Sequence, residues 1–263
     1  MHNFDYHAPK TLDSALALLR DKEDGKIIAG GMTLLPTLKQ RLAAPSDLVD
    51  LATLSELKGV RRDGDEIVIG AMTTHADVAA NADVQSLIPG LAHLASVIGD
   101  PAVRHRGTIG GSVANADPAA DYPAAVVALN ATIVTNKREI AGDDFFVSLF
   151  ETALERDEII TSVRFPIPER AGYEKFRHPA SGYAVVGVMV AKFGDKVRVG
   201  VTGAAGSAFR ATDFEAALEK SFTPDVLLGI AVSPDDLLSD IHCTNEYRAH
   251  LVNVMARRAI AAA

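Results

Sequence analysis

Eight residues decide the fold of this chain: Ile27-Ile28-Ala29-Gly30-Gly31-Met32-Thr33-Leu34. They have the layout of a short buried strand, a glycine pair, a hydroxyl residue and the start of a helix. Glycines can take positive φ and let the backbone approach a ligand closely. Successive amides then point the same way and form an anion-binding nest beside a positive helix N-terminus. The stretch therefore predicts a phosphate-binding loop within an α/β unit.

A second glycine pair predicts the same chemistry. It lies in Thr108-Ile109-Gly110-Gly111-Ser112 and follows the basic run Arg104-His105-Arg106. Two such nests suit a ligand with two adjacent phosphates, hence a dinucleotide. Neither stretch is the G-x-G-x-x-G of a Rossmann unit or the G-x-x-x-x-G-K-S/T of a P-loop. A glycine pair can also mark only a tight turn, so the residues alone predict a phosphate-bearing ligand without identifying it.

Composition is that of an ordinary globular protein. Of the 263 residues, 48% are hydrophobic and 23% charged, and the net charge of -8 argues against nucleic acid as the main partner. No apolar stretch approaches the roughly 20 residues that span a bilayer. The N-terminus lacks the basic and apolar regions of a signal peptide, so a cytoplasmic protein is expected. The single cysteine, Cys243, excludes an internal disulfide and any all-cysteine metal site within the chain.

The first 58 residues predict a compact α/β unit. Its expected elements are a helix over 12–19 after the capping residue Thr11, a strand over 26–29, a helix over 34–42 capped by Thr33, and a strand over 48–51. The turn Asp63-Gly64-Asp65 predicts a hairpin between 60–62 and 66–70. Further expected elements are helices over 74–80, 87–98 and 122–128 and a strand over 131–135.

The segment Pro166–Gly172 marks a boundary in the chain. Two prolines and a glycine near a polar turn interrupt both periodicities there. Beyond it the pattern predicts long strands over 183–193 and 197–201 and helices over 212–219 and 246–262. We therefore expect a C-terminal α+β module from about residue 170.

Several stretches resemble the xanthine dehydrogenase and carbon monoxide dehydrogenase family of molybdenum hydroxylases. The resemblance is carried by the segments 29–36 and 108–123, and also by 4–9, 173–177 and 240–248. It covers nearly the whole chain and is greatest with the separate FAD-binding medium subunits. It implies an α+β chain with a two-subdomain FAD-binding domain of the PCMH type, like that of vanillyl-alcohol oxidase. This domain would span 1–168, with subdomains of about 1–58 and 59–168. A smaller C-terminal α+β flavoprotein domain with an antiparallel sheet would span 169–263.

The same resemblance implies a set of FAD-binding residues. The first loop would wrap the pyrophosphate through Lys26, Ile27, Ile28, Ala29, Gly30, Gly31, Met32, Thr33 and Leu34. Thr108, Gly111 and Ser112 would bind from the other side. Ile98 corresponds to an apolar residue near the flavin ring, and Ile160 to a strand residue that contacts the cofactor; both are equally compatible with core packing.

Three further residues are expected at the flavin end. Asp121 corresponds to an aspartate that hydrogen-bonds the ribityl chain, although Asp121-Tyr122-Pro123 is also a good helix N-cap. Lys175 corresponds to a lysine whose charge would favour the reduced, anionic flavin. Tyr183 matches an aromatic residue over the flavin; otherwise it is a core strand residue. Gly182 stands where an aspartate is common, which puts the local contacts around the ring in doubt.

The chain has no H-E-x-x-H, paired-cysteine or hydrolytic-triad pattern, so we predict neither a catalytic residue nor a metal site of its own. The resemblance places the other redox centres on partners, a small 2Fe-2S iron-sulfur subunit and a large molybdopterin subunit, assembled as a dimer of heterotrimers. Electrons would pass through FAD to an external electron acceptor, with the chemistry supplied by the cofactor.

Two other functions stay open. The first is a free-standing FAD-dependent reductase, against which stands the lack of an obvious proton donor beside the glycine loops. The second is a non-redox module that binds a nucleotide for assembly. The sequence identifies neither the organic substrate nor the acceptor, which could be NAD, quinone or oxygen.

Overall fold

The computed structural model describes all residues from 1 to 263. Its N-terminal unit is a three-stranded parallel sheet of β1 (Asp5–His7), β3 (Asp47–Asp50) and β2 (Lys26–Ile28), in that order. Helix α1 (Leu12–Asp21) and helix α2 (Leu34–Lys39) pack on opposite faces of this sheet. Val49 lies in the core under α1, whereas Ile28 and Leu48 contact Leu38 of α2. Alternate strand residues therefore point to the two helices, as the twofold period of a strand requires.

The ends of these two helices follow local chemistry. Thr11 and Ser14 form a reciprocal capping box, so α1 begins where the sequence predicts. Helix α2 is shorter than expected because Arg41 adopts φ 61° and ends the helical run. Thr33 occupies the predicted N-cap position of α2, but its side chain makes no capping hydrogen bond.

The central unit is a five-stranded antiparallel sheet with helices packed against it. Its order is β4 (Val60–Asp63), β5 (Glu66–Gly70), β10 (Ile160–Pro166), β6 (Thr132–Thr135) and β7 (Glu139–Ala141). The predicted hairpin is β4–β5. Strand β10 inserts between β5 and β6, although about 90 residues separate it from β5 in the sequence. A short η1 helix (Ser55–Leu57) links β3 to this sheet, and β8 (Phe146–Ser148) and β9 (Glu151–Thr152) form a separate hairpin.

The helices of the central unit are short. They are α3 (His75–Ala80), α4 (Ala82–Leu87), α5 (Pro89–Ser96), α6 (Pro101–Arg104), α7 (Ile109–Asn115), α8 (Tyr122–Ala128) and α9 (Gly142–Phe145). The helix predicted over 87–98 is α5, which is two residues shorter at each end. Pro89 disfavours helical backbone at the preceding Ile88, which takes φ -137° and ψ 64°, so one helix ends at Leu87 and another begins at Pro89.

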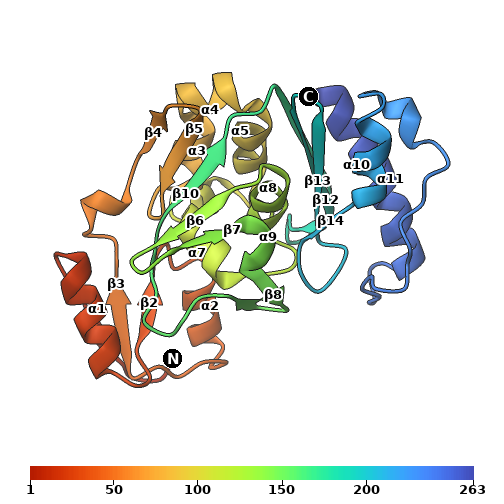
Figure 1. The fold of residues 1–263 in the computed structure, drawn as a ribbon. Coiled ribbons are helices and arrows are strands. Elements are labelled where there is room, and N and C mark those ends of the chain that lie inside the picture. Colours follow the sequence, from red (N-terminus) through yellow and green to blue (C-terminus); the bar gives the residue numbers. More distant parts are fainter.

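The C-terminal unit is a four-stranded antiparallel sheet, as the sequence predicts. Its strands β11 (Arg170–Arg177), β12 (Ala184–Phe193), β13 (Lys196–Thr202) and β14 (Phe209–Arg210) pair in chain order. Helices α10 (Thr212–Leu218) and α11 (Asn245–Ala262), with η2 (Pro224–Leu227), lie on the outer side. Figure 1 shows this sheet between α8 on one side and α11 on the other.

Both faces of the C-terminal sheet are buried. Met189 and Ala191 of β12 belong to the core of the central unit, whereas Val188 and Val190 pack with α11. Glycines allow the close contacts: a Cβ at Gly200 would lie 2.3 Å from the Ala124 carbonyl oxygen of α8. The α+β fold with antiparallel sheets is confirmed. The division into 1–168 and 169–263, with a further division near residue 58, stays a prediction.

Candidate functional site

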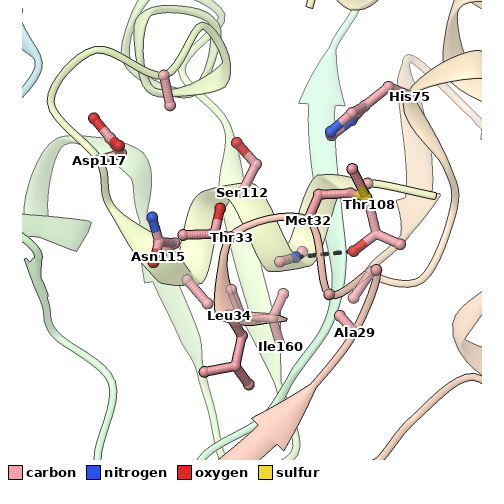
Figure 2. Close-up of a pocket in the computed structure, with 18 of the residues that line it drawn as sticks. Ala29, Met32, Thr33, Leu34, His75, Thr108, Ser112, Asn115, Asp117 and Ile160 are labelled. Atoms are coloured by element: carbon pink, nitrogen blue, oxygen red, sulfur yellow. Dashed lines mark hydrogen bonds between the residues drawn. The ribbon is translucent and has the colours of Figure 1, made fainter. Parts of the chain in front are cut away.

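A cavity of about 510 Å³ lies where the three units meet. The β2–α2 loop, the segment around α7, the start of β10 and the turn 181–183 all contribute to its wall. Every predicted site residue lines this cavity except Ile28 and Lys175. Ile28 points instead into the core between Leu38 and Leu48. Sequence segments up to 150 residues apart are therefore brought to one site, as Figure 2 shows for Thr33, Ser112 and Ile160.

The first glycine loop is an anion-binding backbone turn. Gly31 adopts φ +74°, a conformation that favours glycine. A Cβ at Gly30 would lie 2.1 Å from the Arg106 carbonyl oxygen, so only glycine lets the two loops touch. The amides from Gly30 to Thr33 donate no hydrogen bond to any group of the chain. Gly30 and Gly31 are half-buried, whereas Met32 and Thr33 are exposed at the mouth of the loop. Four successive unused donors beside a helix N-terminus are suited to the oxygens of a phosphate.

The second glycine stretch does not form a second nest. Residues 109–115 are helix α7, and the amides at its start are already used. Ile109 donates to the Thr73 carbonyl at 3.1 Å, Gly110 to the Ala71 carbonyl at 2.8 Å and Gly111 to Thr108 Oγ1 at 3.1 Å. The expectation of two alike nests is therefore wrong. The glycines serve close packing, since a Cβ at Gly110 would lie 2.7 Å from the Ala71 oxygen.

A buried polar network closes one end of the cavity. Tyr173 donates to Asp121 Oδ1 at 2.5 Å, and Lys175 Nζ lies 2.8 Å from the same oxygen. Lys175 also donates to the Gly182 carbonyl at 3.1 Å. Burial raises the pKa of Asp121 and lowers that of Lys175, and their mutual attraction opposes both shifts. The network thus joins β11 to the turn that carries Tyr183.

Two outcomes at this end differ from simple sequence expectations. Asp121 occupies the N-cap position of α8, but its carboxylate makes no capping hydrogen bond and engages Tyr173 and Lys175 instead. Lys175 is only 3% exposed in its side chain and does not line the cavity. The Lys175 ammonium lies behind the residues that line the cavity, where it pairs with Asp121. Tyr183 does line the cavity, and 42% of it is exposed, so it is not a core strand residue.

The cavity also contains polar residues that the sequence did not single out. Asp117 accepts a hydrogen bond from the Ala119 amide at 2.9 Å, and burial raises its carboxyl pKa. This carboxyl is a titratable group on the cavity wall near the glycine loops, where none was expected from the sequence. His75 lies on the opposite side of the view in Figure 2. Asp117 lies within the segment 108–123 that carries the family resemblance, whereas His75 lies in no motif, so only the fold shows that it faces the cavity.

No metal site accompanies the cavity. The chain holds no group of three or more histidine, cysteine, aspartate or glutamate side chains placed to bind a metal ion. Cys243 is buried in the C-terminal core. None of the helices has the length and apolar character needed to cross a bilayer.

The fold brings the three units around one cavity, and a row of unused backbone amides in its wall suits a phosphate-bearing cofactor. Comparison with known proteins gives the family. Residues 2–168 match the FAD binding domain in molybdopterin dehydrogenase. The chain belongs to this family, and it is an FAD-domain subunit of the molybdenum hydroxylase class of oxidoreductases, as the resemblance implied.

Relatives support this assignment over the full length. The chain is 36% identical to the carbon monoxide dehydrogenase medium chain of Hydrogenophaga pseudoflava, over 99% of this chain and 96% of that one. It is also 36% identical to the nicotine 6-hydroxylase medium subunit of Paenarthrobacter nicotinovorans, over 97% and 95%. A solved structure of the Hydrogenophaga pseudoflava carbon monoxide dehydrogenase superimposes with a TM-score of 0.88 at 36% identity and covers 99% of this chain and 97% of its own.

Proposed function

We propose that this chain is the electron-transfer subunit of a molybdenum hydroxylase complex and holds FAD in the central cavity. A large molybdopterin subunit would hydroxylate the organic substrate, and a small subunit would carry the 2Fe-2S clusters. Electrons would leave the FAD to an external acceptor. Relatives named as medium chains or subunits of such dehydrogenases and hydroxylases support this division of labour.

The observation that carries the proposal is the row of unused amides at Gly30–Thr33 in the wall of the cavity. Four successive donors beside a helix N-terminus suit the pyrophosphate of a dinucleotide. Gly30 and Gly31 fit this role in particular, because a side chain at either position would disturb the loop. The residues present therefore fit FAD, with its two phosphates held by a single nest.

The chain's own residues would bind and orient the cofactor. Bound FAD would supply the electron-accepting and electron-donating chemistry. Asp121, held by Tyr173 and Lys175, would offer its remaining carboxylate oxygen to a hydroxyl of the ribityl chain. Tyr183 would cover the ring from the C-terminal unit. Thr108 and Ser112 would supply hydroxyl groups on the wall opposite the first loop.

The assembly and its location belong to the same proposal. We propose a dimer of heterotrimers in the cytoplasm, in which this chain contributes only FAD. The chain alone is not expected to oxidise the organic substrate, because hydroxylation is assigned to the large molybdopterin subunit.

Purification of the tagged chain with its co-expressed neighbours tests the proposal. We expect stoichiometric FAD, iron and molybdenum in the assembly, and a flavin spectrum bleached by the complex's substrate without oxygen. Mass measurement of the co-purifying chains identifies the partners.

Two results would support the other candidate functions. Full substrate turnover by the chain alone would identify a free-standing reductase, for which the Asp117 carboxyl on the cavity wall is a titratable group whose pKa is raised by burial. An assembly that stays colourless after incubation with FAD would identify a non-redox nucleotide-binding module.

A further inference from the structure

The cavity extends past the first glycine loop to a buried histidine that has no partner. His75, the first residue of α3, is 4% exposed and lines the cavity. A Cβ at Gly107 would lie 2.6 Å from His75 Nε2 and 3.1 Å from the Val103 oxygen, so His75 sits beside α6. Neither ring nitrogen makes a hydrogen bond within the chain, and Nδ1 is enclosed. Buried polar groups are normally paired, so an unpaired imidazole on a cavity wall indicates a ligand contact.

The charge state of His75 narrows the kind of ligand. Burial and the nearby Arg104 guanidinium lower the pKa of His75 to about 4, so the imidazole is neutral at pH 7. Arg104 is fixed by the carbonyls of Ile98 at 3.0 Å and Gly99 at 3.1 Å. A neutral imidazole presents one donor and one acceptor rather than a charge. It therefore suits an uncharged heterocycle or a sugar hydroxyl better than a phosphate.

The order of groups along the cavity indicates which part of the cofactor reaches His75. In Figure 2, Met32 and Thr33 of the first loop lie between Asp117 on one side and His75 on the other. The Asp121 network and Tyr183 line the cavity from the side of the C-terminal unit. Figure 2 shows His75 on the side away from Asp117, whose charge acts on Tyr183. With the pyrophosphate at the centre and the flavin under Tyr183, the remaining half of FAD extends toward His75.

The surroundings of His75 have the character of a purine pocket. Val103 lies beside His75, and Ile98, Ala71 and Met72 line the same cavity; all four are apolar. Apolar side chains suit the faces of a base, while a single polar group suits its edge. The structure assigns His75 as the hydrogen-bonding residue for the adenosine half of FAD, an inference that rests on the proposed function. Ile98 would then contact the adenosine rather than the flavin ring.

Three probes separate the two halves of the cofactor. We would titrate FAD, ADP and FMN into the deflavinated protein, purified with its partner subunits, and measure dissociation constants by calorimetry. Wild-type protein is compared with His75→Gln, whose amide can replace Nε2, and with His75→Asn, whose amide cannot reach that position. We expect His75→Asn to raise the dissociation constants of FAD and ADP by a similar factor, about fivefold to tenfold, and to leave that of FMN unchanged. His75→Gln should recover most of the affinity.

A matched control gives the opposite pattern. Tyr183→Ala should weaken the binding of FAD and FMN and leave the binding of ADP unchanged, because Tyr183 lies on the side of the cavity proposed to hold the flavin. Unchanged FMN binding by His75→Asn also shows that this variant is folded. The inference is overturned if His75→Asn binds FAD and ADP as wild type does, or if it loses FMN affinity equally. Failure of the proposed function is a different result, because wild-type protein would then bind neither flavin.

Discussion

Glycine performs two different tasks in the two loops that look alike in sequence. Gly31 is needed for its left-handed backbone at φ +74°, which orients the free amides. Gly110 and Gly111 have helical backbone and are needed because neighbours leave no room for a side chain. The difference could not be predicted from the sequence, because it depends on Ala71 and Ala29, which only the tertiary structure brings close.

Gly111→Val should weaken FAD binding. Its Cβ would lie 2.9 Å from Thr108 Oγ1 and 3.3 Å from the Ala29 Cβ, so the cap of α7 and the first loop must both move. We expect a loss of at least about tenfold in FAD affinity, or about 1.4 kcal/mol. Fluorescence titration measures it. Gly206→Val is the control, since nothing lies within 4 Å of a Cβ there. Equal affinity in both variants would show that α7 does not shape the site.

His75 should make stability depend on pH. Its folded pKa is about 4, below the unfolded value of about 6.5, so the unfolded chain binds more protons between these values. The free energy of unfolding is therefore highest above about pH 6.5, where His75 is neutral in both states. It falls as the pH drops toward 4, by about 3 kcal/mol in all. Urea unfolding of the apoprotein at several pH values tests this. His75→Leu should lack this part of the slope, and an identical slope in both proteins would contradict the assignment.

Among the elements, those set by local chemistry were predictable and those set by distant partners were not. The Thr11 capping box and the Asp63-Gly64-Asp65 turn define α1 and the β4–β5 hairpin directly. The position of β10 between β5 and β6 depends on pairing across about 90 residues. Likewise, nothing near Lys175 in sequence shows that Asp121 and the Gly182 carbonyl will engage its ammonium.

The Lys175–Asp121 pair should be essential for the join between β11 and the α7–α8 segment. Lys175→Met leaves the Asp121 carboxylate buried with only the Tyr173 hydroxyl, so we expect a loss of about 3–5 kcal/mol in the free energy of unfolding. Lys175→Met with Asp121→Asn should recover much of this loss, because no uncompensated charge remains. Urea unfolding of wild type, Lys175→Met, Asp121→Asn and the double variant measures the coupling between the two side chains. A loss below about 1 kcal/mol in the single variant would mean that water reaches Asp121.

For the whole molecule, the first loop and the family were predictable, whereas the cavity was not. The sequence identified residues from all three units, and most of them line one space. It could not show that Ile28 faces the core, that Lys175 lies behind the wall or that His75 and Asp117 face the cavity. These facts depend on how the units pack, and side-chain direction in short strands changes with a single residue of register.

The docking of the C-terminal sheet on α8 should control the site from a distance. Gly200→Ala places a Cβ 2.3 Å from the Ala124 oxygen, so the sheet must shift. We expect a stability loss of about 1–3 kcal/mol and faster release of FAD, although Gly200 does not line the cavity. Thermal unfolding and stopped-flow flavin release measure the two effects. Gly206→Ala serves as the control, and loss of stability with unchanged release would show that the units act separately.

The position of Tyr183 in the chain has a consequence for how the protein is made. On a ribosome, the Gly30–Thr33 loop emerges long before the turn 181–183 that completes the wall beside it. A nascent chain therefore displays the anion-binding amides without the C-terminal side of the cavity. Domains generally fold in the order in which they are synthesised, so we expect stable binding of the cofactor only after β11 and β12 have been made. Cells starved of riboflavin should accordingly accumulate full-length apoprotein rather than stalled fragments.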